Sequence, residues 1–287
     1  MEVVARDLVS IETVDVGVGT WTFTCRAAGS TDGRLVILLH GFPQTSWSWR
    51  HQLTALADAG FRAVAPDQRG YSAGARPKGV EHYALDHLIA DVLGIADDMG
   101  GHEFDLVGHD WGGLIAWYLA GRVRGRVRTL TVVSTPHPLA FAEALGRSTD
   151  QQQRSTYVGF FRQEGTEDVM LADGAQGLRN LYLGSGLPES NAEEYLRVLT
   201  QPGALAGGLD YYRATSFYDA LNIGPITAPT MYVWSTDDVA LGRDAAEATG
   251  AHVEGPYRFE VLEGVSHWIP EHAPDTLNAL LLDHLRQ

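Results

Sequence analysis

The stretch Phe104-Asp-Leu-Val-Gly108-His-Asp110-Trp-Gly-Gly113 decides how this chain folds. Its first residues are typical of a buried strand, and an apolar helix is predicted to follow it as far as Leu119. Between them, Asp110 lies in the pattern Gly-x-Asp-x-Gly, whose small residues allow a strained turn and a closely packed helix. Because this position joins a strand to a helix, it favours Asp110 as a nucleophile, although a helix N-cap is the simpler alternative.

Strands and helices are predicted to alternate over most of the rest of the chain. Such alternation is typical of an α/β fold with a mostly parallel central sheet flanked by helices. The predicted strands are a hairpin in residues 8–27 and single strands at residues 35–39, 61–65, 104–107, 130–133, 230–234 and 259–262. The predicted helices are residues 46–60, 81–99 and 111–119, and one that closes the chain with Leu277, Leu280, Leu281 and Leu285 on one face.

Residues 139–225 break this alternation. They are polar and glycine-rich and are predicted to form short helices, and they contain too many aromatic residues for a disordered excursion. We therefore predict a core domain of residues 1–138 and 226–287, with residues 139–225 as a helical cap inserted between two strands.

The composition limits the kind of partner. The net charge of −15 argues against nucleic acid or an anionic membrane, because phosphate groups would be repelled. The single cysteine, Cys25, excludes an intrachain disulfide and a cysteine metal cluster. We find no signal peptide and no apolar run long enough to span a bilayer, and so expect a soluble, cytoplasmic protein, either a monomer or a homodimer.

Two further side chains are predicted to lie near Asp110, because ligands bind at the carboxyl ends of parallel strands. His267 follows the last strand and is suited to activate water as a general base. Asp237 and Asp238 follow the preceding strand, and either could orient this histidine or cap the next helix. Three other histidines near this edge are interpreted as scaffold or pocket lining: His40, His109 and His137.

An aspartate nucleophile limits the chemistry. Attack by a carboxylate on a saturated carbon gives an alkyl ester, and water can then attack the ester carbonyl and regenerate the aspartate. Epoxides and haloalkanes suit this sequence of steps. Esters and amides do not, because attack on them would give an anhydride.

Together these motifs resemble the epoxide hydrolases of the α/β-hydrolase superfamily. The resemblance implies the α/β-hydrolase fold, and its family spacing places the triad acid four positions after Trp234, which favours Asp238. The family commonly has Gly where this chain has Ser235. The residues that carry the resemblance are His40-Gly-Phe-Pro43, Gly108-His-Asp-Trp-Gly-Gly113, Trp234-Ser-Thr-Asp-Asp238 and Gly264-Val-Ser-His-Trp268.

The resemblance also assigns roles around the nucleophile. It implies an oxyanion hole made by the backbone N–H groups of Phe42 and Trp111, and a Phe42–Pro43 peptide bond that is often cis. It places His40, Pro43 and Trp111 in the substrate pocket. Two cap tyrosines, Tyr157 and Tyr212, would hold the epoxide oxygen and donate a proton to it; their alternative role is to pack the cap on the core.

The sequence therefore predicts an enzyme that converts an epoxide and water to a vicinal diol through an ester on Asp110, with neither a metal nor an organic cofactor. One alternative is a haloalkane or haloacid dehalogenase with the same nucleophile. Some haloalkane dehalogenases, however, have Asn where this chain has Phe42, and fluoroacetate dehalogenases have Arg where it has Trp111. The other alternative is a binding protein of the same fold, which would more naturally have lost the triad or the tyrosines.

Overall fold

The computed structural model describes residues 10–286, except for the side chains of residues 217, 218 and 220. A central sheet has eight strands in the order β1-β2-β4-β3-β5-β6-β7-β8. It is parallel from β4 to β8, while β1 and β2 pair antiparallel at one edge. The strands are β1 Glu12–Val18, β2 Trp21–Ala28, β3 Arg34–Leu39, β4 Phe61–Pro66, β5 Phe104–His109, β6 Val127–Val133, β7 Thr230–Asp237 and β8 Tyr257–Ser266.

This architecture confirms the predicted α/β fold with its mostly parallel sheet. The N-terminal hairpin has the register Val14↔Cys25, and Cys25 is fully buried. The predicted start of this hairpin at residues 8 and 9 lies outside the described residues. The other predicted strands all form, and the last of them runs from residue 257 to residue 266, longer than expected.

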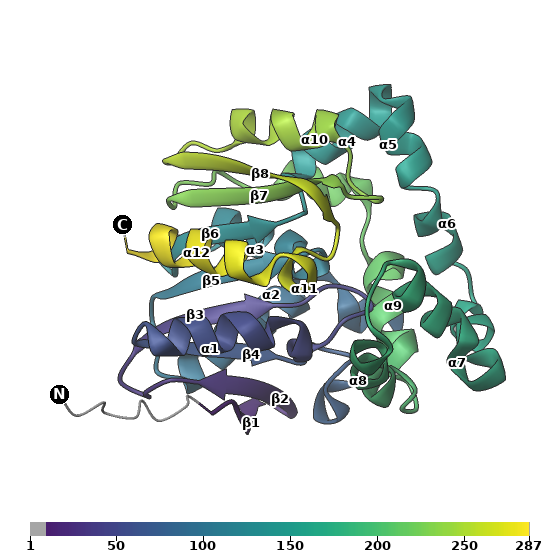
Figure 1. The fold of residues 1–287 in the computed structure, drawn as a ribbon, viewed down its shortest axis with the longest axis horizontal. Coiled ribbons are helices and arrows are strands. Elements are labelled where there is room, and N and C mark those ends of the chain that lie inside the picture. Colours follow the sequence, from purple (N-terminus) through teal and green to yellow (C-terminus); the bar gives the residue numbers. More distant parts are fainter. Residues whose placement is uncertain (1–9, 287) are drawn as a thin grey trace.

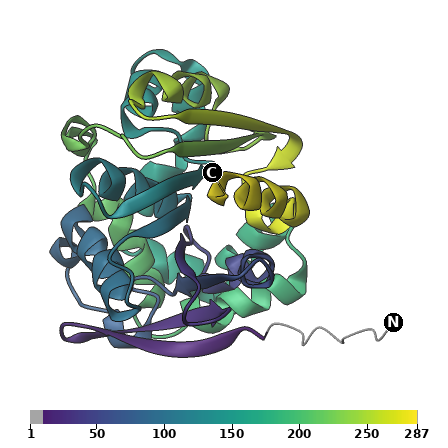
Figure 2. The same cartoon turned by 90° about the vertical axis from the view of Figure 1, so that its left-hand side faces the viewer.

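Helices cover both faces of the sheet because its central strands are apolar on both sides. Val36 and Leu38 of β3 pack with α1 and α12, whereas Ile37 and Leu39 face α2 and α3. Figure 2 shows these two helical layers on opposite sides of the sheet. The helices of the sheet region are α1 Arg50–Asp58, α2 Leu85–Asp98, α3 Trp111–Arg122, α10 Arg243–Ala248, α11 Ile269–His272 and α12 Pro274–Leu285, with short 3₁₀ helices at Ser46–Trp49, Ala73–Ala75, Val80–Tyr83 and Thr249–His252.

Between β6 and β7 the chain forms helices and no strand, as the sequence predicts for residues 139–225. Figure 1 shows α5 to α9 in a layer beside one end of the sheet. The division of the chain into a core domain and a cap domain at these residues stays a prediction. The inserted helices are α4 Pro138–Arg147, α5 Thr149–Arg154, α6 Tyr157–Phe161, α7 Thr166–Gly184 (interrupted by non-helical backbone at residues 172–175), α8 Glu189–Leu199, α9 Ala204–Ala214 and the 3₁₀ helix η4 Phe217–Asn222.

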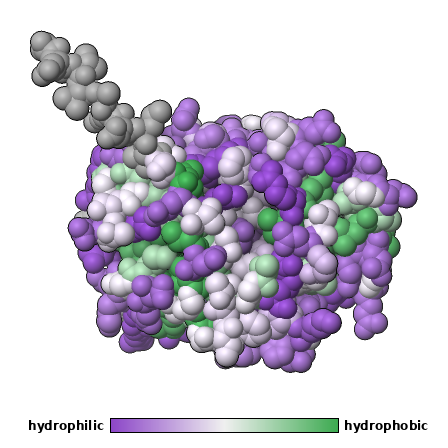
Figure 3. All heavy atoms as spheres, turned by 90° about the horizontal axis from the view of Figure 1, so that it is seen from below, coloured by the Kyte–Doolittle hydropathy of each residue, from purple (hydrophilic) through white to green (hydrophobic). Residues whose placement is uncertain are grey.

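The surface is mixed in character. On the face shown in Figure 3, hydrophobic residues form small groups among hydrophilic ones, as is usual for folded proteins. Within residues 10–286, no helix has the length and apolar character needed to cross a membrane. The expected monomer or homodimer stays a prediction.

Candidate active site

Asp110 occupies a sharp turn between β5 and α3, with a φ of 51° that non-glycine residues rarely adopt. Glycine is required on both sides of this turn because a Cβ atom would not fit. A Cβ on Gly108 would overlap the backbone of Gly112, and a Cβ on Gly112 would overlap the carbonyl of Leu39. The Asp110 side chain makes no capping hydrogen bond to α3, so the simpler N-cap role is not what the structure shows.

The two carboxylate oxygens of Asp110 have different surroundings. Oδ1 accepts a 2.8 Å hydrogen bond from the backbone N–H of Phe42, and Oδ2 lies 3.6 Å from Nε2 of His267. Burial acts to raise the pKa of Asp110, but the hydrogen bonding and charge of His267 outweigh it and lower the pKa. Asp110 is therefore a carboxylate at neutral pH. The Phe42–Pro43 peptide bond is cis, as the resemblance implies.

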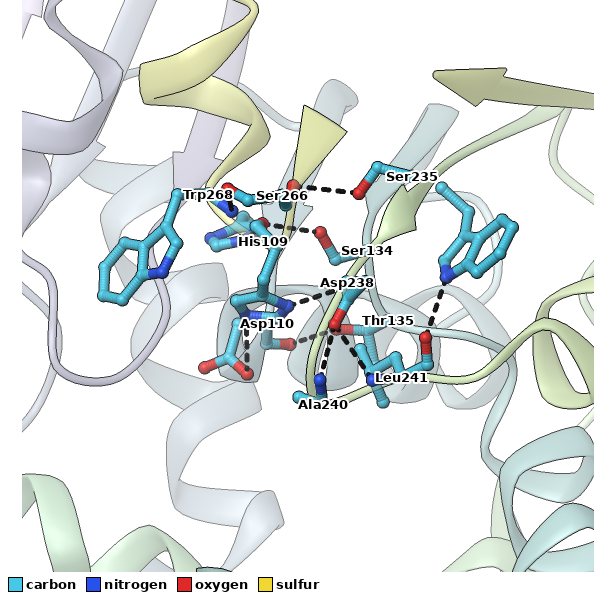
Figure 4. A network of polar contacts seen from close by, with 12 residues as sticks. His109, Asp110, Ser134, Thr135, Ser235, Asp238, Ala240, Leu241, Ser266 and Trp268 are labelled. Atoms are coloured by element: carbon cyan, nitrogen blue, oxygen red, sulfur yellow. Dashed lines mark hydrogen bonds and ion pairs between the residues drawn. The ribbon is translucent and has the colours of Figure 1, made fainter. Parts of the chain in front are cut away.

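His267 is oriented by Asp238 rather than by Asp237. The Nδ1 atom of His267 lies 2.8 Å from Oδ2 of Asp238, which is fully buried. The other carboxylate oxygen of Asp238 accepts hydrogen bonds of 2.8 and 2.9 Å from the N–H groups of Ala240 and Leu241. Asp237 is exposed to solvent. Figure 4 shows Asp238 with the backbone groups of Ala240 and Leu241 that it binds.

The histidine lies between two negative charges. Burial acts to lower the pKa of His267, but the nearby charges of Asp238 and Asp110 outweigh it and raise the pKa to about 10. In the free protein His267 is therefore an imidazolium paired with two carboxylates.

Tyr157 and Tyr212 line the same cavity as Asp110, with their ring centroids 6.3 Å apart. The ring of Tyr212 also packs edge-on against Trp111, with a centroid distance of 4.8 Å. Burial, followed by the charge of Asp110, raises the pKa of both phenols. Both hydroxyls are therefore protonated and able to donate a hydrogen bond into the cavity.

The cavity has a volume of about 430 Å³ and mostly apolar walls. Trp111 lines it, as expected, but the predicted pocket residues His40 and Pro43 are not among its lining residues. His40 is fully buried below the site, where its ring nitrogens contact the carbonyl of Gly41 and the N–H of Gln68. These contacts hold the turn, and the assignment of His40 and Pro43 to the substrate pocket stays a prediction. Apolar side chains of the wall include Leu114, Pro138, Phe141, Leu145, Val158 and Leu241.

The histidines His109 and His137 also make scaffold contacts. His109 is buried, and its Nε2 lies 2.9 Å from the backbone oxygen of His267. Burial lowers the pKa of His109 to about 4, so its ring is neutral. The Nδ1 atom of His137 accepts from the N–H of Leu139 at the start of α4.

Helix α5 contains site residues that the sequence did not reveal. Its Gln151 is fully buried and donates to the carbonyl of Ala240 at 2.9 Å, while its Oε1 accepts from the N–H of Gly242 at 2.7 Å. Arg154 of the same helix donates to the backbone carbonyl of Asp238. Both hold the loop that carries the acid. Within the polar run Thr149–Arg154 nothing distinguishes these two side chains from solvated ones.

No group of three or more histidine, cysteine, aspartate or glutamate side chains in the described part of the chain is arranged to hold a metal ion. The polar centre of the site is the contact of Asp110, His267 and Asp238, with two tyrosines across the cavity. Chemically, this set could supply a nucleophile, a base with its orienting acid, and proton donors.

Comparison with known proteins shows which family the chain belongs to. Residues 34–274 match the family model for the alpha/beta hydrolase fold. Over 271 residues the chain is 35% identical to Epoxide hydrolase 4 of Mus musculus, covering 91% of this chain and 75% of that protein. It is 32% identical to the AB hydrolase superfamily protein YfhM of Bacillus subtilis (strain 168), covering 92% of this chain and 94% of that one.

Solved structures agree. A structure described as one of the novel epoxide hydrolases from metagenomes of hot environments superposes with a TM-score of 0.87 at 31% identity, covering 96% of this chain and 99% of that chain. The chain therefore belongs to the α/β-hydrolase fold family and, within it, to the epoxide hydrolases.

Proposed function

We propose that this protein hydrolyses an epoxide to a vicinal diol through a covalent ester on Asp110. The observation that carries the proposal is the position of the Asp110 carboxylate. One of its oxygens is held by the N–H of Phe42, and the carboxylate shares a cavity with two protonated tyrosines. The names of the relatives support epoxide hydrolysis itself.

In the first step, Oδ2 of Asp110 attacks a ring carbon of the epoxide and forms a C–O bond. The ring C–O bond breaks, its electron pair stays on the ring oxygen, and that oxygen takes a proton from Tyr157 or Tyr212. The tyrosinate regains a proton as the imidazolium of His267 gives one up. The loss of the Asp110 charge in the ester favours this transfer, since that charge helps to hold the proton on His267.

In the second step, neutral His267 takes a proton from water, and the hydroxide attacks the ester carbonyl. The N–H groups of Phe42 and Trp111 stabilise the oxyanion. The acyl C–O bond then breaks, and the diol oxygen takes the proton from His267. This leaves Asp110 as a carboxylic acid beside a neutral His267, and the acid proton passes to the imidazole. Asp110 is then again a carboxylate beside an imidazolium, which is the starting state.

The walls of the cavity support an apolar substrate. The phenyl group of styrene oxide, or the chain of an alkyl epoxide, could pack against apolar side chains of the wall such as Leu114, Phe141 and Leu145. A dehalogenase would need no proton donor for a halide leaving group, so the paired tyrosines favour the epoxide.

Two experiments test the proposal. The first is a side-by-side assay with styrene oxide, a bromoalkane, fluoroacetate and p-nitrophenyl acetate. Diol formation from styrene oxide should be the fastest reaction, and faster cleavage of the ester would overturn the proposal. Faster halide release would assign the site to a dehalogenase.

The second experiment follows the oxygen atoms. A single turnover in ¹⁸O-labelled water should place the label in the Asp110 carboxylate, and the diol should be unlabelled, because its new oxygen comes from Oδ2. Label in the diol would instead mean direct attack by water. Asp110→Asn serves as the control and should give neither diol nor labelled peptide.

A further inference from the structure

We propose that Ser134 and Ser235 are positioning residues that hold the loop of His267 for the ester-hydrolysis step. This inference rests on the proposed function and adds two residues to it. Neither serine contacts the cavity, and both act on the backbone of the loop that follows β8.

The two hydroxyls bind consecutive carbonyl groups of this loop. Ser134, directly after β6, donates to the backbone oxygen of His267 at 3.0 Å. Ser235, near the end of β7, donates to the backbone oxygen of Ser266 at 2.9 Å. Both donors are fully buried, and Figure 4 shows them reaching the loop from two different strands. The backbone at the end of β8 and directly after it is therefore held by serine hydroxyls at two adjacent peptide groups, and Nε2 of His109 also lies 2.9 Å from the His267 carbonyl oxygen.

Ser134 is kept in an unfavourable conformation. Its φ of 67° is left-handed, which is strained for a residue with a Cβ. Its N–H donates to the carbonyl of Val233, and its own carbonyl accepts from the hydroxyl of Tyr232, each at 2.8 Å. Such conformations persist where surrounding contacts fix them, and they gather at functional sites. Here the strained backbone directs the hydroxyl at His267.

Ser235 makes the second contact from a different strand. Its buried hydroxyl donates to the backbone oxygen of Ser266, and a residue without a hydroxyl at this position could not make this hydrogen bond.

Ester hydrolysis, the second step, depends on the position of the His267 backbone. Asp238 fixes only the Nδ1 side of the His267 ring, whereas Nε2 must reach a water molecule beside the Asp110 ester. A shift of the His267 backbone would move Nε2 relative to Asp110, from which it stands 3.6 Å away. In the first step His267 does not act on water and only returns a proton to the tyrosinate after the ring has opened, so that step is far less sensitive to this shift.

The test separates the two steps. For Ser134→Ala we expect the rate of ester formation to stay within about 3-fold of wild type. Rapid quenching and intact-mass spectrometry measure this rate. We expect ester hydrolysis to fall by roughly 10-fold or more, because displacements of about 1 Å in a catalytic group can cost 10²-fold. The ester should accumulate, so kcat and KM should fall together while kcat/KM is preserved. Ser235→Ala should show the same pattern more weakly.

Two controls keep the result interpretable. Ser134→Gly removes the same hydroxyl but relieves the left-handed strain, so it should be more stable than Ser134→Ala yet equally slow in ester hydrolysis. Thr129→Ala removes a buried hydroxyl at the other end of β6, where it binds Asp105 at 2.8 Å, and should lower stability without changing the ratio of the two rates.

The outcomes are distinct. Equal loss of both steps in Ser134→Ala, or full hydrolysis in Ser134→Gly, would overturn the positioning role while leaving the proposed function intact. If wild type forms neither ester nor diol from any epoxide, the proposed function itself fails.

Discussion

The backbone N–H of Phe42 donates a 2.8 Å hydrogen bond to Oδ1 of Asp110. This contact makes the two carboxylate oxygens unequal before any substrate binds. Oδ1 accepts this hydrogen bond, whereas Oδ2, which lies 3.6 Å from Nε2 of His267, is the attacking oxygen of the proposed mechanism. In that mechanism Oδ1 becomes the carbonyl oxygen of the ester, beside an N–H donor where negative charge would develop during hydrolysis.

The first prediction concerns this contact. A Cβ at residue 41 would overlap the Asp110 side chain, so Gly41→Ala should displace the carboxylate from the Phe42 N–H. We expect ester formation to fall by about 10²-fold or more, because a displacement of about 1 Å in a reacting group can cost that much. Gly146→Ala, on an exposed part of α4 with open space around it, should react like wild type. Rapid-quench mass spectrometry measures both, and normal ester formation in Gly41→Ala would contradict the prediction.

The second prediction assigns the acid. Asp238→Asn removes the carboxylate that lies 2.8 Å from His267, and should slow ester hydrolysis by roughly 10²-fold or more while leaving the protein folded. Asp237→Asn should change it little, because Asp237 is exposed. Steady-state kcat with styrene oxide measures the effect. The reverse ranking would transfer the role to Asp237.

The third prediction concerns the two phenols. Replacing Tyr157 and Tyr212 together with Phe removes both proton donors. Ester formation from an epoxide should then fall by roughly 10²-fold or more for each lost transition-state hydrogen bond. Any reaction with a bromoalkane should hardly change, because bromide needs no proton. Equal losses with both substrates would mean that the tyrosines only shape the cavity.

The fourth prediction follows from the charge of His267. Its pKa rises from an ordinary 6.5 to about 10 in the folded protein, so its ion pairs stabilise the fold fully below pH 6.5. That contribution is lost as the pH rises towards 10. The free energy of unfolding of wild type should therefore fall more between pH 6.5 and 10 than that of His267→Gln. Urea titrations across this range measure the difference, and parallel curves would refute it.

His267→Gln also traps the intermediate, which gives the fifth prediction. The ring-opening step does not need the histidine as a base, so an epoxide should still alkylate Asp110, and the ester should persist. Intact mass should show protein plus one substrate, mapped to the peptide that contains Asp110. Asp110→Asn should show no such adduct, and its absence in His267→Gln would contradict the covalent mechanism.

Local signals made much of this molecule predictable. The strand, the turn and the helix around Asp110 are each specified by neighbouring residues, and the glycines at positions 108 and 112 are needed where the backbone comes close. His267 could be found because it follows the last strand. The choice of Asp238 over Asp237 needed the family spacing, since adjacent residues at a strand end differ only in which one turns inward.

The remaining features depend on contacts that sequence patterns do not carry. The sequence predicts His40 as scaffold or pocket lining, and only the fold shows that its ring nitrogens contact the carbonyl of Gly41 and the N–H of Gln68. Gln151 lies in a polar helix, and only the packing of α5 on the core buries it. The left-handed backbone of Ser134 follows from the strands that meet there, and a serine gives no local sign of it.

The hydrogen bonds between α5 and residues 238–242 have a consequence for protein engineering. Gln151 belongs to the segment inserted between β6 and β7, yet it completes the hydrogen bonding of a loop in the sheet region. The inserted helices are thus not an interchangeable module. A chimera that takes its inserted helices from a relative would also replace the hydrogen bonds that hold the loop of Asp238. It would need a glutamine at the position of Gln151 to restore them. Without this glutamine, we expect an exchange of the inserted helices that is meant only to change substrate preference to slow ester hydrolysis for every substrate.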